Sequence, residues 1–368
     1  CQSVAYANVQ RILAVGTSTG VVKLFGAQGV EVLLRDANNR SAIVHMRFNR
    51  SGSKLLCFSA NTLFQIYDTH SFKKIGGLSP GWTRGAAIAC VHVPHDTDHP
   101  YVYVGLDTGD VVVVDYHVSE CTGYRISAAA LCVMDDNQDD DLIAFIESDP
   151  ADLNRVLIGF ERAGLILWDL GKRRVLKRYL LPANLSEMAL GGDPFLSCAA
   201  WHQSGQQFVA GFSSGHIVIF DAAHKGSGKI QSLCMVPLEN PKPVSHVHWA
   251  SSPLGEQGPG AIVVAGGNDM HGVTVLWQRG GHAHKGSWSV APVDPMDGPV
   301  CSMVLPTWDS SPVMELLLTY PPGQGPYANV EDAHPSGYIM LGGDPLDGVL
   351  PRLYVQPLPG KPSSAAML

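Results

Sequence analysis

The sequence predicts an all-β fold, and three observations point to it. Short apolar runs rich in branched side chains recur along the whole chain of 368 residues. Most of the 39 glycines and 25 prolines fall between these runs, where they are typical of tight turns. No long stretch has the period of an amphipathic helix, so we expect no long helix.

The clearest repeat unit runs from Val156 to Leu170. Two apolar strands flank a turn bounded by Gly159 and Gly164, and Trp168-Asp169 ends the second strand. With an inner strand before it and an outer strand after it, the unit recurs every roughly 40 to 55 residues, as blades of a β-propeller do. We predict one seven-bladed propeller of degenerate WD-like repeats over residues 1–358, with blades at about 1–36, 40–78, 85–128, 141–182, 194–237, 243–293 and 298–358.

Each blade is justified by its own apolar runs. In the first four blades the predicted strands are 12–15, 21–25 and 30–34; 43–48, 54–59, 62–68 and 72–78; 88–93, 101–106, 110–116 and 123–127; 142–146, 156–158, 165–167 and 174–180. In the last three they are 196–201, 207–212, 216–221 and 229–236; 244–249, 261–265, 273–277 and 287–291; 300–305, 313–319, 337–341 and 352–355. Residues 359–368 are expected to form a flexible tail.

The repeat has a signature of glycines and of Trp or Asp at strand ends. We interpret the glycines as turn residues that supply a positive φ. The third strands, such as 111–114 and 165–167, are almost continuously apolar, which predicts that both faces are buried against neighbouring blades. The signature residues are Gly16, Gly20, Gly105, Gly109, Gly159, Gly164, Trp168, Asp169, Trp201, Gly205, Gly211, Gly215 and Asp221.

Composition narrows the function classes. The net charge of −8 argues against a nucleic-acid surface, which needs clustered Lys and Arg. The eight cysteines are scattered singly without zinc spacing, which fits a reducing, cytoplasmic location and predicts no metal from this source. No apolar run reaches the roughly 18 residues of a membrane span, and no signal peptide is visible.

Motifs that resemble catalytic or metal sites have simpler interpretations. The G-x-S-x-G matches at 16–20 and 211–215 are each followed by a strand, whereas a nucleophile elbow precedes a helix. The acidic run 135–141 lacks the Gly and Glu of a calcium loop. A propeller enzyme would need acid or metal ligands on its innermost strands, and 43–48, 88–93 and 196–201 are mostly apolar. We therefore predict no catalysis and no cofactor.

Two charged groups are candidate partner-binding loops. The acidic group is either a solvated connection or a docking patch for a basic partner. The basic group, which Lys177 and Arg178 extend, is either a charged edge strand or a contact for anionic lipid or an acidic protein. His246 and His248 share a strand face, as a core or channel-lining pair would. The residues of the two groups are Asp135, Asp136, Asp139, Asp140 and Asp141, and Lys172, Arg173 and Arg174.

Three segments resemble one known family. Residues 9–20 (VQRILAVGTSTG), with LFG at 24–26 and GVE at 29–31, resemble the first blade of the lethal giant larvae/tomosyn family. Residues 157–170 and the AWH at 200–202 are similar to two later motifs of that family. Blades six and seven diverge from it.

The resemblance implies two tandem propellers, of which this chain would hold the first. It implies binding of syntaxin-type SNARE proteins, control of vesicle exocytosis and polarised secretion, links to small GTPases and myosin II, and peripheral association with the plasma membrane through partners. The alternative is a propeller scaffold of another complex, such as a coat or a ubiquitin-ligase adaptor. As docking surfaces we expect the connections 78–87, 135–141 and 182–194.

Overall fold

The computed structural model describes most of residues 3–222 and the strands beyond them. The described residues are 3–7, 9–26, 31–94, 99–131, 141–162, 164–179, 194–222, 229–230, 232–237, 244–250, 261–266, 273–278, 288–293, 302–304, 314–319, 336–342 and 352–357. Side chains are described up to residue 222 and over 244–249. The regular secondary structure within these residues consists of β-strands, without any helix.

The described strands form seven sheets, in which chain neighbours pair antiparallel. The first contains β1 (Ser3–Ala7), β2 (Ile12–Gly16), β3 (Val22–Phe25) and β4 (Glu31–Leu34), and the second β5 (Ile43–Phe48), β6 (Lys54–Ser59), β7 (Phe64–Asp68) and β8 (Lys74–Leu78). The third contains β9 (Ile88–His92), β10 (Tyr101–Leu106), β11 (Val111–Asp115) and β12 (Glu120–Ile126). The fourth contains β13 (Ile143–Ser148), β14 (Arg155–Phe160), β15 (Gly164–Asp169) and β16 (Arg174–Tyr179), with β20 (Lys229–Ile230) added in parallel at its edge.

The remaining three sheets follow the same order. The fifth contains β17 (Leu196–Trp201), β18 (Gln207–Phe212), β19 (His216–Asp221) and β21 (Ser232–Pro237). The sixth contains β22 (Val244–Ala250), β23 (Ala261–Gly266), β24 (Val273–Gln278) and β25 (Trp288–Val293), and the seventh β26 (Ser302–Val304), β27 (Met314–Thr319), β28 (Ser336–Gly342) and β29 (Arg352–Pro357).

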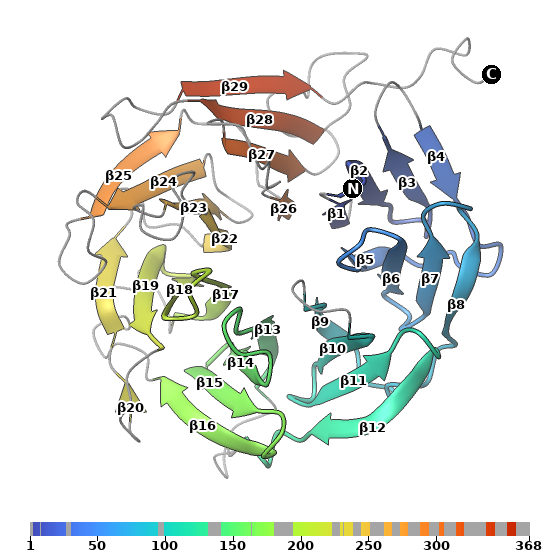
Figure 1. Ribbon diagram of the computed structural model, residues 1–368, viewed down its shortest axis with the longest axis horizontal. Helices are drawn as coiled ribbons and strands as arrows, with labels where there is room; N and C mark the ends of the chain where they lie inside the picture. Colours follow the sequence, from blue (N-terminus) through green and yellow to red (C-terminus); the bar gives the residue numbers. More distant parts are fainter. Residues whose placement is uncertain are drawn as a thin grey trace.

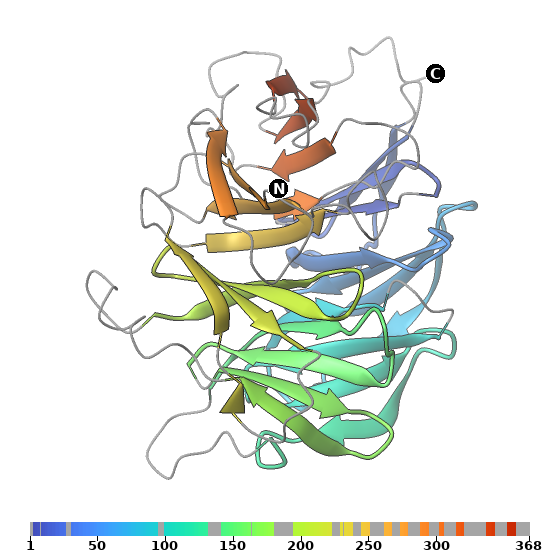
Figure 2. The same cartoon turned by 60° about the vertical axis from the view of Figure 1, so that its left-hand side comes forward.

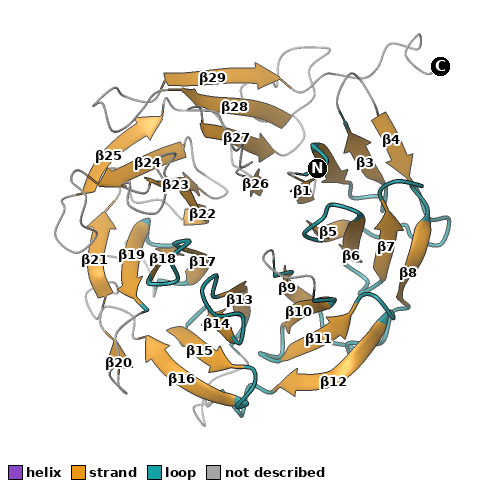
Figure 3. Cartoon of the chain, viewed as in Figure 1, coloured by secondary structure: helices purple, strands orange, loops and turns teal. Residues whose placement is uncertain are grey.

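The sheets stand in a ring around a central axis, with the first strand of each innermost and the last strand outermost (Figures 1 and 3). Neighbouring sheets pack face to face (Figure 2). One shared core joins Leu157 and Leu165 of the fourth sheet to Phe208 and Phe220 of the fifth. The all-β propeller prediction is confirmed, and strands β11 and β15 are buried almost throughout, as their apolar sequences predict.

Three strand predictions were wrong in detail. The innermost strand of the first sheet, β1, was missed because Ser3–Ala7 has neither a long apolar run nor a glycine at its end. Strand β13 continues beyond Ile146 to Ser148, so Glu147 belongs to an innermost strand. The single outer strand predicted at 229–236 is two strands, β20 on the fourth sheet and β21 on the fifth.

The signature glycines fall into two classes, which corrects their interpretation as turn residues. Five lie in the left-handed region that turns require: Gly20, Gly109, Gly164, Gly205 and Gly215. The other four, Gly16, Gly105, Gly159 and Gly211, are not among the residues with positive φ. At each of these four, an added Cβ would stand 2.6–3.0 Å from the innermost strand of the next sheet, and at Gly16, Gly105 and Gly159 it would stand closer still to the innermost strand of its own sheet. At Gly16 the Cβ would stand 2.9 Å from Ile43 Cβ, and at Gly211 2.6 Å from Val244 Cγ1.

A β-bulge accompanies these crossings. The pairing of the innermost strand with its neighbour shifts by one residue near its start in sheets two to six, for example between Ile43 and His45 and between Val244 and His246. A bulge bends and twists a strand. The bend falls next to the glycine of the preceding sheet, so glycine and bulge together set the close contact between sheets.

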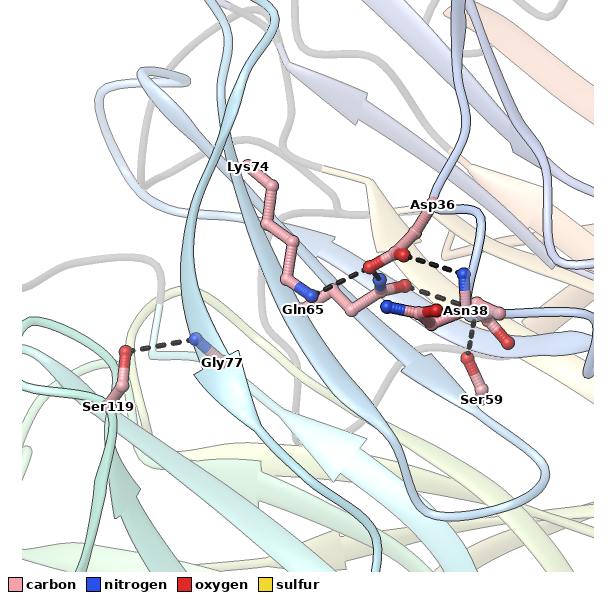
Figure 4. A network of polar contacts seen from close by, with 8 residues as sticks. Asp36, Asn38, Ser59, Gln65, Lys74, Gly77 and Ser119 are labelled. Carbon is pink, nitrogen blue, oxygen red and sulfur yellow. Dashed lines mark hydrogen bonds and ion pairs between the residues drawn. The ribbon is translucent and has the colours of Figure 1, made fainter.

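The junction of the first two sheets also carries a polar network (Figure 4). The Asp36 carboxylate, 13% exposed, accepts hydrogen bonds from Gln65 Nε2 (2.6 Å) and the Asn38 backbone N–H (2.9 Å), and pairs with Lys74 Nζ at 2.7 Å. The hydrogen bond from Lys74 is the largest cause of a lowered Asp36 pKa. This carboxylate therefore joins the connection after β4 to two strands of the second sheet.

Substituting Asp36 by Asn should reveal this pKa shift as a pH-dependent loss of stability. A carboxyl whose pKa is lower folded than unfolded stabilises the fold above its unfolded pKa, and that contribution disappears as the pH falls through the folded value. We expect Asp36→Asn to lose about 1–2 kcal/mol in urea unfolding at pH 7, with a smaller loss near pH 3. An equal loss at both pH values would contradict the assignment.

Adding a methyl group at a junction glycine should destabilise the ring. Gly211→Ala would force Cβ against Val244 and the Cys198 sulfur, for an expected loss of about 1–3 kcal/mol in urea unfolding. Gly171→Ala is the matched control, because Gly171 has no positive φ and its nearest neighbour, Asp169 Oδ1, would be 3.5 Å from the new Cβ. The control should stay within about 0.5 kcal/mol of wild type.

Candidate interaction surface

The predicted basic group lies in the turn that joins β15 to β16. Lys172, Arg173 and Arg174 are all exposed there. Asp169, the last residue of β15, accepts the backbone N–H of Lys172 (2.8 Å), which is the largest cause of its lowered pKa, and its Oδ2 lies 3.4 Å from Lys172 Nζ. Asp169 of the signature thus fixes the turn that presents the basic residues.

Trp168 and Tyr124 hold this turn against the third sheet. The Tyr124 hydroxyl donates to the Leu170 carbonyl (2.9 Å) and accepts from Trp168 Nε1 (3.1 Å). The Arg173 guanidinium lies 4.8 Å from the centre of the Tyr124 ring, a cation–π contact. The basic turn is therefore positioned by residues of two adjacent sheets.

The same turn occurs in the second and third sheets. Asp68 and Asp115 end β7 and β11, and each accepts backbone N–H groups two and three residues later, at 2.6–3.3 Å. The fifth residue of each turn has positive φ without being glycine: Phe72 (56°), Ser119 (59°) and Arg173 (52°). We name these three segments, 68–73, 115–120 and 169–174, the display turns. Sequence reasoning missed the first two, although an Asp after each apolar third strand was the available signal.

The display turns follow one another around the ring. Ser119 accepts the backbone N–H of Gly77 on β8 (3.1 Å, Figure 4), and Tyr124 joins β12 to the third display turn. The first two present apolar side chains, with Val118 61% and Phe72 38% exposed, and Ile75 of the adjoining strand is 52% exposed. The third presents the basic group. The surface therefore exposes large apolar side chains over two sheets, beside polar residues such as Lys73 and His117, and a basic group over the next.

The edge of β16 is more enclosed than the sequence suggested. Lys177 Nζ donates to the Ala222 carbonyl (2.6 Å), Arg178 Nη2 donates to the Leu131 carbonyl (2.5 Å), and β20 pairs with the end of the strand. Neither cation is a free surface charge. The interpretation of β16 as a solvated edge strand is therefore wrong for its second half, whereas Lys172 to Arg174 stay exposed.

Other predicted positions are placed as follows. Asp135, Asp136, Asp139 and Asp140, most of connection 182–194 and the tail at 359–368 lie outside the described residues. Asp141 accepts the Arg162 backbone N–H at 3.1 and 3.2 Å, which ties it to the β14–β15 turn. In connection 78–87, Trp82 Nε1 donates to the Thr62 carbonyl (2.6 Å).

Two further signature residues end strands of the fifth sheet. Trp201 ends β17, and the centre of its ring lies 5.1 Å from the centre of the Phe208 ring. Asp221 ends β19. In the part of the chain with described side chains, no three His, Cys, Asp or Glu groups are arranged to hold a metal ion. No helix long and apolar enough to cross a membrane occurs among the described residues.

Replacing Tyr124 by Phe should test how the third display turn is held. The change leaves the indole N–H of Trp168 and the carbonyl of Leu170 without their partner, for an expected cost of about 1–3 kcal/mol. The measurement is urea unfolding followed by tryptophan fluorescence. Tyr101→Phe, at an exposed tyrosine, is the matched control and should stay within about 0.5 kcal/mol of wild type.

Comparison with known proteins identifies relatives at low identity. No family model matches the chain. "LLGL scribble cell polarity complex component 2" of Mus musculus is 26% identical over 238 residues, which covers 58% of this chain and 21% of that protein. "Lethal(2) giant larvae protein homolog 1" of Rattus norvegicus is 25% identical over 296 residues, which covers 72% of this chain and 27% of that protein.

The chain thus spans about a fifth to a quarter of the length of these curated relatives. They support the family resemblance that the repeat motifs predicted: the chain is similar to lethal giant larvae proteins over 58–72% of its length.

Proposed function

We propose that this chain is a non-catalytic interaction domain that acts in cell polarity, and that the display turns are its partner-binding surface. The polarity role rests on the relatives, since the Mus musculus relative is named a cell polarity complex component. The binding role rests on one observation, the run of three turns with one geometry and different exposed side chains. Rigid turns bind a partner without a large cost of ordering the loops.

The chemistry of the surface indicates the kind of partner. An amphipathic helix with an apolar face and acidic residues beside it would place the apolar face on Phe72 and Val118 and its carboxylates near Arg174. Syntaxin-type SNARE proteins, which the family resemblance implies as partners, are the partner class that we propose. Through them the domain would regulate exocytosis and polarised secretion at the plasma membrane.

Small GTPases and myosin II are further partners that the resemblance implies. We assign no surface to either of them. A cytoplasmic domain that associates with the membrane only through its partners fits all of these proposed roles.

Charge reversal at the third display turn should weaken binding of a syntaxin-type SNARE. The double variant Lys172→Glu, Arg174→Glu keeps Arg173 on Tyr124, and pull-down titration at about 0.1 M salt should show at least a tenfold weaker complex. The difference should shrink at high salt, because exposed charges are screened.

The matched control is the double variant Arg35→Glu, Arg40→Glu. Both residues are exposed in the connection between β4 and β5, at the opposite end of the strands from the display turns. Normal binding by the display-turn variant, or an equal loss in both variants, would contradict the proposed surface.

A further inference from the structure

Charged and imidazole side chains converge at the centre of the ring, where the sequence suggested mostly apolar innermost strands. His45 and Arg47 lie on β5, Cys90 and His92 on β9, Glu147 on β13, and His246 and His248 on β22. Arg47 interacts electrostatically with Glu147, Cys90 and His246. Strand β22 lies across the ring from β5 (Figure 1), so the interaction between Arg47 and His246 spans the centre of the ring.

Arg47 has unused hydrogen-bonding capacity. In the part of the chain whose side chains are described, its hydrogen bond runs from Nη1 to the Met46 carbonyl (2.9 Å), and no carboxylate oxygen lies within 4.0 Å of it. A guanidinium carries five N–H donors in a planar fork, which matches two oxygens of one anion. A cation enclosed in protein without a paired anion is costly, so an anionic ligand would stabilise this arrangement.

Glu147 is held by another residue, His92. The Ser148 backbone N–H donates to His92 Nε2 (3.1 Å), so the neutral imidazole carries its proton on Nδ1, which lies 3.5 Å from Glu147 Oε2. Burial raises the pKa of Glu147 to about 7, against a smaller lowering by Arg47. Near neutral pH this carboxyl is therefore partly protonated and only partly offsets the charge of Arg47.

Three of the other groups, His45, His246 and Cys90, are neutral near pH 7. Burial lowers the pKa of His45 and of His246 to about 4 and raises that of the Cys90 thiol to about 12. Solvent nevertheless reaches the cluster, since the Glu147 side chain is 36% accessible and Arg47, His45, His246 and His248 are partly accessible. A small solute can therefore approach Arg47 from the axis.

We propose that Arg47 binds a small oxyanion at the centre of the ring, with the imidazole of His246 as a neighbouring polar group. The ligand class is a group that offers two oxygens to one guanidinium, such as a phosphate, a sulfate or a carboxylate. The bound anion would link the second sheet to the sixth across the ring. This site is independent of the display turns.

The test measures saturable anion binding by the 368-residue chain. Isothermal titration and thermal unfolding would be run with sodium sulfate, phosphate or acetate at constant ionic strength. Sulfate also stabilises proteins non-specifically, so the response of Arg47→Met sets the baseline. We expect wild type to bind at least one anion saturably and Arg47→Met to lose that binding, whereas Arg174→Met, at an exposed arginine, retains it.

The three anions distinguish the sources of the ligand. If sulfate and phosphate bind more tightly than acetate, the ligand is of the phosphate class. If acetate binds more tightly, the ligand is a carboxylate. Arg47→Met should fold, because an apolar side chain of similar length in place of an enclosed charge is often tolerated.

Substituting Glu147 provides a second variant, which should strengthen anion binding where Arg47→Met abolishes it. Sulfate keeps its charge between pH 6 and 8, while Glu147 loses its proton, so wild-type affinity should fall by up to about tenfold over this range. Glu147→Gln should bind sulfate about tenfold tighter than wild type at pH 8 and equally at pH 6. No saturable binding by wild type, unchanged binding by Arg47→Met, or no gain from Glu147→Gln at pH 8 would each overturn the proposal.

Discussion

The close approach of each innermost strand to the preceding sheet is the constraint on which the ring depends. At four junctions it requires a residue without Cβ: Gly16, Gly105, Gly159 and Gly211 lie directly against the next inner strand. In the second sheet the residue paired with the inner strand after the bulge is Phe58, which is buried and stacks on Phe64 at 4.4 Å. The inner strand opposite it carries His45 and Arg47, so this departure from the glycine rule coincides with the polar cluster at the axis.

The sequence was most informative where local chemistry repeats. Apolar third strands and glycines at hairpins predicted β11, β15 and their turns, because strand burial and turn conformation are local properties. The role of the junction glycines could not be predicted. Gly16 and Gly20 look alike in sequence. Gly20 needs a left-handed backbone, whereas Gly16 needs space beside Ile43, which lies 27 residues later on the next inner strand.

The candidate surfaces were predictable only in part. Lys172 to Arg174 stood out as the one basic cluster, and they are exposed as a docking group must be. The axial cluster was hidden because β13 was expected to end with its last apolar residue, Ile146. The shared strand face marked His246 and His248 in the sequence, whereas neither hydrophobic periodicity nor a turn signal marked Arg47 or Glu147. The convergence of polar residues from β5, β9, β13 and β22 is a property of ring closure alone.

Sheet packing and surface chemistry meet in the Trp-Asp pair of the fourth sheet. Trp168 is 4% exposed and donates to Tyr124 of the third sheet, while Asp169 holds the backbone of the turn that follows. The pair therefore connects a sheet-to-sheet contact with the geometry of a display turn. The second and third sheets have Tyr67-Asp68 and Val114-Asp115 at the corresponding strand ends, and their turns keep the same backbone. Because Asp fixes the turn, the residues after it are free to differ, and a repeat built for packing can present a surface that changes from sheet to sheet.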